Sequence, residues 1–220
     1  MDVLPFDVIG AGAGGSVKRA IHVPTHTFIA LKVMTVFDRE KRKQLVNELR
    51  ALADADKNRD GCESVVGFLG AYYDAKHETV CVALEFADGG SLESALERAG
   101  RPMPPVVVGD VCAQVAAGLE YLHEKKRLVH RDVKPGNVLV RRSGACKITD
   151  FGIVARSKMM EVTNTNDVGG DEHEQKNFSS QKSVALRSFK GSLRYMSPER
   201  VERKPYGRAA DVWSLGVTLG

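Results

Sequence analysis

The pattern of apolar residues changes near residue 87, and this change constrains the fold more than any other feature of the chain. Before residue 87, short segments rich in Val, Ile and Phe are separated by turn residues and predict β-strands. These segments are 3–9, 17–23, 28–36, 65–73 and 80–86. One segment among them, 38–53, carries leucines at helical spacing and predicts a helix. After residue 87 the apolar spacing turns helical, with one apolar stripe at 92–99 and a longer one at 108–122, so we expect an α+β fold with a sheet first and helices second.

Composition restricts the classes of function. Hydrophobic residues make up 43% of the 220 residues and charged residues 27%, which is typical of a folded domain. The formal net charge is +4, and the charges are interspersed, so we expect no nucleic-acid partner. The four cysteines, Cys62, Cys81, Cys112 and Cys146, lack metal-site spacing and are expected to be reduced thiols. Neither a signal-like start nor a run of about 18 apolar residues is found, so we expect a cytoplasmic protein without a membrane partner.

The first chemical motif is a glycine-rich run at 10–17 with the pattern G-x-G-x-x-G-x-V. Glycine lets a backbone approach phosphate oxygens closely and present its amides to them. Dinucleotide-binding folds use a similar run, but a helix follows it there. Here Val17, Ile21 and Val23 alternate as in a strand, which favours a loop folded over a nucleotide and counts against a dinucleotide oxidoreductase. Taken alone, Lys32 in the next strand could equally be an exposed strand lysine.

Two later motifs decide between these interpretations. Residues 130–137, HRDVKPGN, match H-R-D-x-K-P-x-N, and residues 150–152, DFG, follow an apolar strand. Together with the glycine loop and the strand lysine, they occur in the order and at the spacing of the protein kinases. The chain therefore resembles that family over nearly its whole length. The resemblance implies two lobes, an antiparallel sheet plus one helix and then a mainly helical lobe, with ATP bound between them.

In the N-terminal part, the resemblance implies a nucleotide-binding surface. Lys32 would hold the α and β phosphates of ATP, oriented by an ion pair with Glu48, for which Glu40 is the weaker alternative. Leu84 falls at the gatekeeper position, and the backbone of 85–87, the hinge, would hydrogen-bond adenine. The ATP-binding residues implied by the resemblance are Gly10, Ala11, Gly12, Gly15, Val17, Ala30, Lys32, Glu85 and Ala87.

In the C-terminal part, the resemblance implies the phosphoryl-transfer machinery, which works mainly by positioning and charge neutralisation. Asp132 would orient the attacking hydroxyl and accept its proton, and Lys134 would stabilise charge on the transferred group. Asn137 and Asp150 would bind Mg²⁺, because both offer the oxygen ligands that this ion prefers. Asp211 matches the helix aspartate that braces the catalytic loop in kinases.

The segments between these motifs are similar to MAP kinase kinases. They are 10–15, 66–71, 85–92 and 191–200. The last, GSLRYMSPER, is the most specific, because its Ser-Pro-Glu replaces the commoner Ala-Pro-Glu. The resemblance implies a dual-specificity kinase that phosphorylates Thr and Tyr in the activation loop of a MAP kinase. Its expected partners are that MAP kinase and an upstream MAP kinase kinase kinase.

Activation is expected to depend on phosphorylation between the DFG triplet and Ser-Pro-Glu. A phosphate there could pair with an arginine, for which Arg131 is the candidate, and order the segment. Ser188 is the leading phosphosite because it lies three residues before Gly191. Ser183 is an open alternative for a companion site, since the spacing in animal members would place that site at Val184.

The expected domains are an N-lobe with the hinge at 1–87 and a C-lobe at 88–220. The polar stretch 157–187 predicts a flexible insertion in the activation segment, either without a role or serving docking or regulation. We expect an incomplete C-lobe, because the chain ends within a helix that begins near Asp211. Two functions stay open: an active dual-specificity kinase, and a truncated or pseudokinase-like module that binds nucleotide or a partner without turnover.

Overall fold

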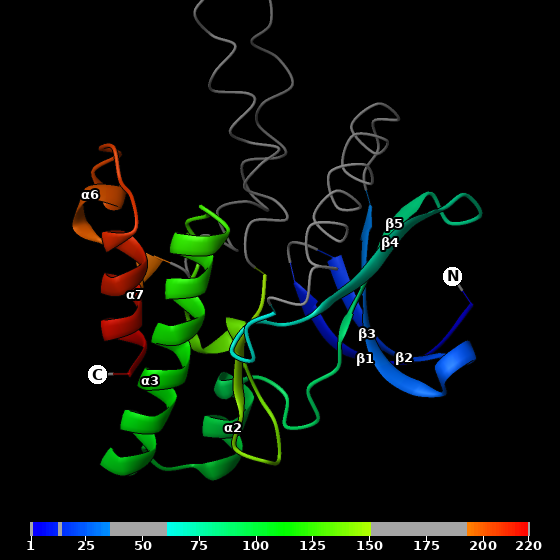
Figure 1. Cartoon of the computed structure of the whole chain (residues 1–220), viewed down its shortest axis with the longest axis horizontal. Coiled ribbons are helices and arrows are strands. Elements are labelled where there is room, and N and C mark those ends of the chain that lie inside the picture. The colour runs from blue at the N-terminus through cyan, green and yellow to red at the C-terminus, as the bar shows by residue number, and fades with distance from the viewer. Residues whose placement is uncertain (1, 13–14, 36–60, 151–192, 220) are drawn as a thin grey trace, which may run out of the picture. The chain divides into compact units, whose positions relative to one another are not determined.

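The computed structural model describes residues 2–12, 15–35, 61–150 and 193–219 (Figure 1). The predicted helix at 38–53 with Glu48, the insertion at 157–187 and the phosphosites Ser183 and Ser188 lie outside the described residues. The contacts divide the chain into two compact units. The first is Met1–Gly90 with Leu139–Lys147, and the second is Ser91–Val138 with Ile148–Gly220.

The first unit is built on a five-stranded antiparallel sheet. Its strands are β1 (Val3–Gly12), β2 (Gly15–His22), β3 (Thr27–Thr35), β4 (Phe68–Asp74) and β5 (Thr79–Glu85). They lie in the order β1-β2-β3-β5-β4, and the short 3₁₀ helix η1 (Val23–Thr25) connects β2 to β3. All five strands expected from the sequence are present, within a few residues of the expected bounds.

The strand register separates the two faces of this sheet. Ala20 pairs with Ile29 and Leu31 with Ala83, so these apolar side chains share one face. The buried cluster on this core face consists of Ala20, Ile29, Leu31, Cys81 and Ala83. Because side chains alternate along a strand, the residues between them point to the other face. On that other face, Val17 pairs with Lys32, and Ala30 pairs with Leu84. Ala30 and Lys32 lie two residues apart in β3, so all four side chains share this face.

The second unit is mainly helical among its described residues. Its helices are α2 (Leu92–Ala99), α3 (Pro105–Glu120), η2 (Tyr121–Lys125), η3 (Pro135–Asn137), α6 (Pro198–Val201) and α7 (Ala209–Leu219). α2 begins at an N-cap, because the Ser91 hydroxyl accepts a 3.1 Å hydrogen bond from the Ser94 amide. It ends at Gly100, whose φ of 60° is in the left-handed region that glycine tolerates. The sheet in one unit and the helices in the other confirm the α+β class.

The helical stretch from Pro105 to Lys125 is long and apolar enough to cross a membrane, judged by length and composition alone. Core helices of globular domains pass the same test. Here α3 packs against α7, and its residues Val111, Val115 and Leu119 are buried. One face of α3 therefore packs within the second unit.

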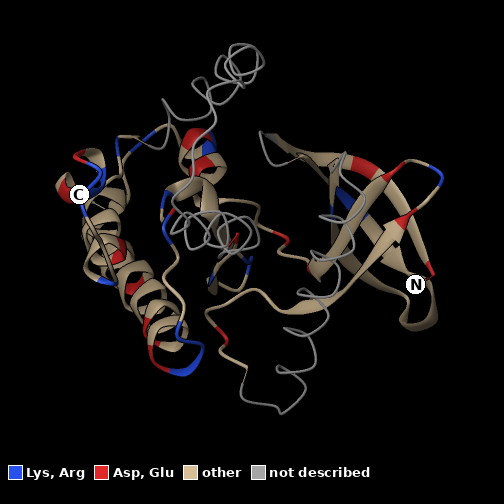
Figure 2. Cartoon of the chain, turned by 90° about the horizontal axis from the view of Figure 1, so that it is seen from above, with Lys and Arg blue, Asp and Glu red and all other residues tan. Residues whose placement is uncertain are grey.

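A two-stranded hairpin, β6 (Val138–Val140) with β7 (Cys146–Ile148), follows η3. Residues Leu139–Lys147 of this hairpin make their contacts within the first unit. Acidic and basic residues are interspersed over the described elements (Figure 2).

Candidate catalytic site

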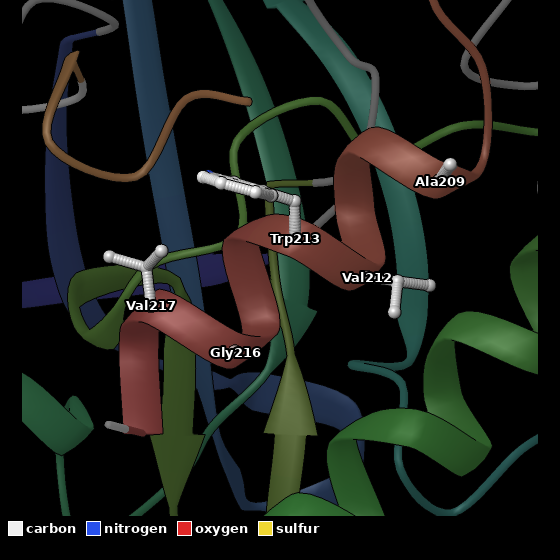
Figure 3. Close-up of a pocket in the computed structure, with 5 residues that line it drawn as sticks. All are labelled: Ala209, Val212, Trp213, Gly216 and Val217. Atoms are coloured by element: carbon white, nitrogen blue, oxygen red, sulfur yellow. The ribbon is translucent and has the colours of Figure 1, made fainter. Parts of the chain in front are cut away.

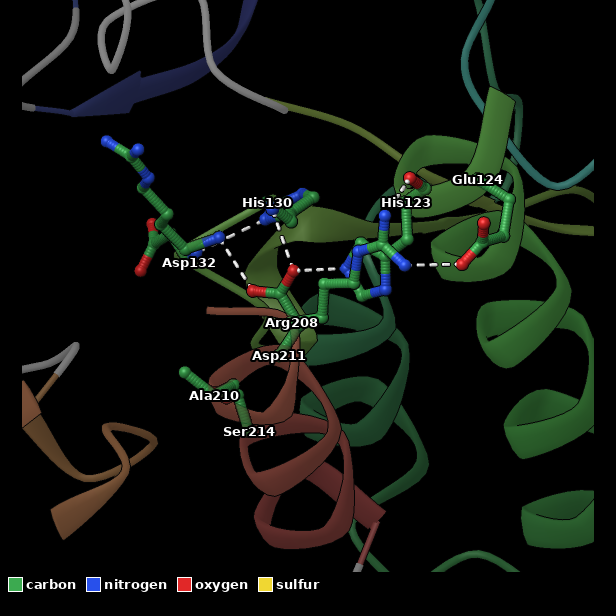
Figure 4. A network of polar contacts seen from close by, with 9 residues as sticks. His123, Glu124, His130, Asp132, Arg208, Ala210, Asp211 and Ser214 are labelled. Carbon is green, nitrogen blue, oxygen red and sulfur yellow. Dashed lines mark hydrogen bonds and ion pairs between the residues drawn. The ribbon is translucent and has the colours of Figure 1, made fainter. Parts of the chain in front are cut away.

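The loop at 130–137 is fixed at its start by Asp211, in the first turn of α7. The Asp211 carboxylate accepts 2.7 Å hydrogen bonds from the backbone amides of His130 and Arg131, one at each oxygen (Figure 4). Its Oδ2 also lies 2.8 Å from Nε2 of His123. Asp211 is only 1% exposed, so a buried carboxylate is satisfied by three donors from a distant part of the chain. The aspartate expected to brace the catalytic loop occupies that position.

His130 connects the loop to the residue that follows β7. Its Nε2 lies 2.9 Å from the carbonyl oxygen of Thr149, and its Nδ1 accepts a 3.2 Å hydrogen bond from the Asp132 amide. An imidazole that donates at one nitrogen and accepts at the other is neutral. Burial lowers the pKa of His130 below its ordinary value, although the nearby Asp211 charge opposes the shift. The neutral ring thus holds the backbone of Asp132 in place.

Asp132 lies at the centre of a three-residue polar cluster. Its Oδ2 is 2.7 Å from the Lys134 Nζ and accepts a 2.9 Å hydrogen bond from the Asn137 amide nitrogen. That same nitrogen also donates to the Asp132 backbone carbonyl at 2.7 Å. The Asp132 side chain is 42% exposed, so an oriented carboxylate is presented at the surface of this unit. The structure therefore brings Asp132, Lys134 and Asn137 together.

The two residues expected to bind a metal fit that role in different ways. The side-chain amide nitrogen of Asn137 donates its hydrogen bonds to Asp132, so the side-chain oxygen of Asn137 points away from Asp132. That oxygen is a hard ligand of the kind that Mg²⁺ prefers. Asp150 is exposed and has a φ of 63°, an uncommon backbone conformation that recurs at functional sites. Within the ranges that the structure describes, no group of three or more His, Cys, Asp or Glu residues forms a metal cage. The fit of Mg²⁺ rests on these two oxygen donors.

The first unit holds the residues expected to bind ATP. Lys32 lies in β3, is only 7% exposed, and shares a sheet face with Val17 and Ala30. Gly15 has a φ of 112°, and a Cβ there would lie 2.0 Å from the Val33 carbonyl oxygen, so only glycine fits. The other expected positions are Gly10, Ala11 and Gly12 at the end of β1, Glu85 at the end of β5 and Ala87 just after it.

His123 is a site residue that the sequence interpretation missed. It is buried in η2, and its ring contacts Asp211 while its backbone carbonyl accepts a 2.9 Å hydrogen bond from Arg208 Nη2. The Arg208 guanidinium also forms an ion pair with Glu124. The available signal in the sequence was a histidine directly after the apolar stripe at 108–122. That signal does not identify the partner of His123, because Asp211 lies 88 residues away.

A shallow apolar hollow on α7 is a second surface feature (Figure 3). The residues that line it are Ala209, Val212, Trp213, Gly216 and Val217. All come from one helix and none carries a titratable group. This hollow therefore offers no side chain for proton transfer.

Comparisons with known proteins agree with the geometry. The protein kinase domain family model matches residues 5–220. Mitogen-activated protein kinase kinase 3 of Arabidopsis thaliana is 40% identical over 97% of this chain and 36% of its own length. Dual specificity mitogen-activated protein kinase kinases of Dictyostelium discoideum and Drosophila melanogaster are 36% and 35% identical over 99% of this chain, and over 29% and 47% of their own lengths.

The chain spans less than half the length of these three relatives. The family model nevertheless covers nearly all of the chain, and the catalytic-loop cluster lies within the matched residues. The chain therefore belongs to the protein kinase family and is similar to its MAP kinase kinase members.

Proposed function

We propose that this chain is the catalytic region of an ATP-dependent dual-specificity kinase of the MAP kinase kinase type. It would transfer the γ-phosphoryl group of ATP to Thr and Tyr in the activation loop of a MAP kinase. The observation that carries the proposal is the Asp132 carboxylate, held by Lys134 and Asn137 on a loop fixed by buried Asp211. The names of the relatives support the substrate class.

The geometry supports a defined role for each residue of the cluster. The Asn137 amide and the His130 ring fix the Asp132 side chain and backbone, so the carboxylate is set to accept a proton from a substrate hydroxyl. The Lys134 ammonium, beside that carboxylate, would stabilise the negative charge of the transferred phosphoryl group. Asn137 and Asp150 would hold Mg²⁺, which supplies charge neutralisation on the phosphates when bound.

The first unit would bind the nucleotide. Lys32 offers a buried ammonium for the phosphates, and the β1 and β2 glycines allow close approach of backbone amides. An upstream MAP kinase kinase kinase would activate the enzyme by phosphorylating Ser188, with Ser183 as the second candidate. We also propose that the protein acts in the cytoplasm.

The test is transfer of labelled phosphate from MgATP to a catalytically inactive MAP kinase. We expect the chain carrying Ser188→Glu to label both Thr and Tyr. The matched control carries Asp132→Asn as well, which keeps the side-chain shape but removes the proton acceptor, and should give no label. A chain that unfolds cooperatively and binds ATP but transfers no phosphate would overturn catalysis in favour of a binding module without turnover.

A further inference from the structure

Glu85 ends β5 at the first position of the hinge, and its side chain lies on the core face of the sheet. Glu85 pairs with Ile29 in the strand register, whereas Lys32 pairs with Val82. Residues 29 and 32 of β3 point to opposite faces. The Glu85 carboxylate therefore lies on the face opposite to the one that carries Lys32, and it serves some purpose other than contacting the phosphates.

Three groups converge on this carboxylate. Arg141 Nη2 donates to its Oε1, and Lys147 Nζ lies 3.1 Å from its Oε2. The Gly67 amide also donates to Oε2, at 3.0 Å, while the Glu85 amide returns a 2.8 Å hydrogen bond to the Gly67 carbonyl. One side chain thus connects the end of β5 both to the segment before β4 and to the β6–β7 hairpin.

Burial makes the ion pair between Lys147 and Glu85 structurally important, whereas the Arg141 side chain is 40% exposed. The side chains of Lys147 and Glu85 are 11% and 24% exposed. A buried ammonium is costly unless an opposite charge compensates it. The Arg141 Nε atom is buried without a hydrogen-bond partner among the residues that the structure describes. Glu85 is therefore the carboxylate that pairs with two cations of the hairpin, Arg141 and Lys147.

Further hydrogen bonds extend the same attachment to the residues that directly follow the hinge. The Gly89 amide donates to the Val140 carbonyl at 2.9 Å, and the Val140 amide donates to the Gly90 carbonyl at 2.8 Å. The Arg142 amide donates to Asp88 Oδ1 at 3.0 Å. Residues 85–90 and the hairpin residues 139–147 form one connected piece of the first unit, which we call the hinge clasp.

We infer that Glu85 is a positioning residue for adenine, which acts through its side chain on the backbone of the hinge. The inference rests on the proposed function, since that function places adenine against the backbone of 85–87. The Glu85 ion pairs hold this backbone on the hairpin before the nucleotide arrives. Preorganised groups bind more tightly because less ordering remains for the binding step. Glu85 therefore sets adenine affinity without touching the phosphates.

The test measures the affinity of the protein for adenosine and, separately, for magnesium tripolyphosphate. These two probes represent the nucleoside end and the phosphate end of ATP. Calorimetric titrations would use the chain, the Glu85→Gln variant and the Glu85→Gln/Lys147→Met double variant. The double variant removes the charges of Glu85 and Lys147 together, so the buried Lys147 ammonium is not left without its carboxylate if the single variant fails to fold. We expect the affinity for adenosine to fall about tenfold, which corresponds to the loss of one charge-assisted hydrogen bond that holds the hinge backbone. The affinity for tripolyphosphate should stay unchanged. Asp7→Asn, which removes the carboxylate of an exposed ion pair with Arg19 in the same unit, is the matched control.

Each outcome decides the inference. Unchanged adenosine affinity in a cooperatively folded variant would overturn it, and so would an equal loss for tripolyphosphate, which would indicate general damage to the unit. A wild-type chain that binds neither adenosine nor ATP would overturn the proposed function and this inference with it. The wild-type titration thus distinguishes the two failures.

Discussion

The Asp211 carboxylate accepts a 2.7 Å hydrogen bond from the backbone amide of His130, 81 residues earlier in the chain. Because Asp211 lies in the first turn of α7, this bond places the start of the catalytic loop relative to a helix of the same unit. The neighbouring bond to the Arg131 amide uses the second oxygen, so both oxygens of the carboxylate are engaged. The conformation of the loop depends on α7.

Asp211→Asn should therefore destabilise the second unit and abolish phosphoryl transfer. The amide nitrogen of asparagine cannot accept a hydrogen bond, so at least one buried donor loses its partner. We expect the free energy of unfolding to fall by about 3 kcal/mol, measured by urea denaturation. Glu124→Gln, which removes the carboxylate of the more exposed pair with Arg208, should cost less than about 1 kcal/mol. Equal losses in the two variants would contradict the role of Asp211.

Stability should decrease as the pH falls below about 6.5, partly because of His130. Its pKa in the folded chain is lowered by burial, so the unfolded chain takes up the proton first as the pH falls. Protonation of the unfolded state lowers the free energy of unfolding, and the loss can reach about 1.4 kcal/mol per pH unit for one group. His130→Phe should show a shallower decline between pH 7 and pH 5 in urea denaturation. Parallel curves for the two proteins would count against a buried neutral His130.

Lys32→Met should remove phosphoryl transfer while preserving the fold. Methionine has a similar length and is apolar, so it fills the buried position of Lys32 without leaving a cavity. We expect the rate of phosphoryl transfer to fall by on the order of 10²-fold or more, because the variant lacks the positive charge that would contact the phosphates of ATP. Rate and thermal midpoint should be measured on the same preparation. A variant that retains the wild-type rate would exclude Lys32 from the site.

Two glycine-to-alanine changes should have opposite effects on stability. In Gly89→Ala the new Cβ would lie 2.4 Å from the Val140 carbonyl oxygen, so the hinge clasp must move apart at a cost of about 1–3 kcal/mol. Gly109→Ala adds a methyl group in open space within α3 and should stabilise by about 0.5–1 kcal/mol. Denaturant titration of both variants checks the sign, and destabilisation by both would contradict the predicted difference.

Much of the fold was accessible from local patterns in the sequence. Short segments rich in Val, Ile and Phe predicted all five strands of the sheet, and helical spacing predicted α2 and α3, because these signals depend on neighbours within a few residues. The bounds were less accurate: α3 begins at Pro105, whereas its apolar stripe begins at Val108. A proline supports a helix start without being part of the apolar face.

The candidate site was predictable only as a set of positions. The motifs at 10–17, 130–137 and 150–152 indicated the chemistry and, through the resemblance, the role of each residue. They gave no signal for His123, whose importance comes from its contact with Asp211. They assigned Glu85 a backbone role alone, because its side-chain partners Arg141 and Lys147 lie far along the chain.

The sequence by itself determined the elements of this protein and the chemical groups available to it. Tertiary structure alone decided which groups meet: Asp132 with Lys134 and Asn137, Asp211 with His130, and Glu85 with the hairpin. The physical reason is that secondary structure follows from short-range periodicity, whereas a buried charge needs a partner that only the folded backbone brings within hydrogen-bond distance.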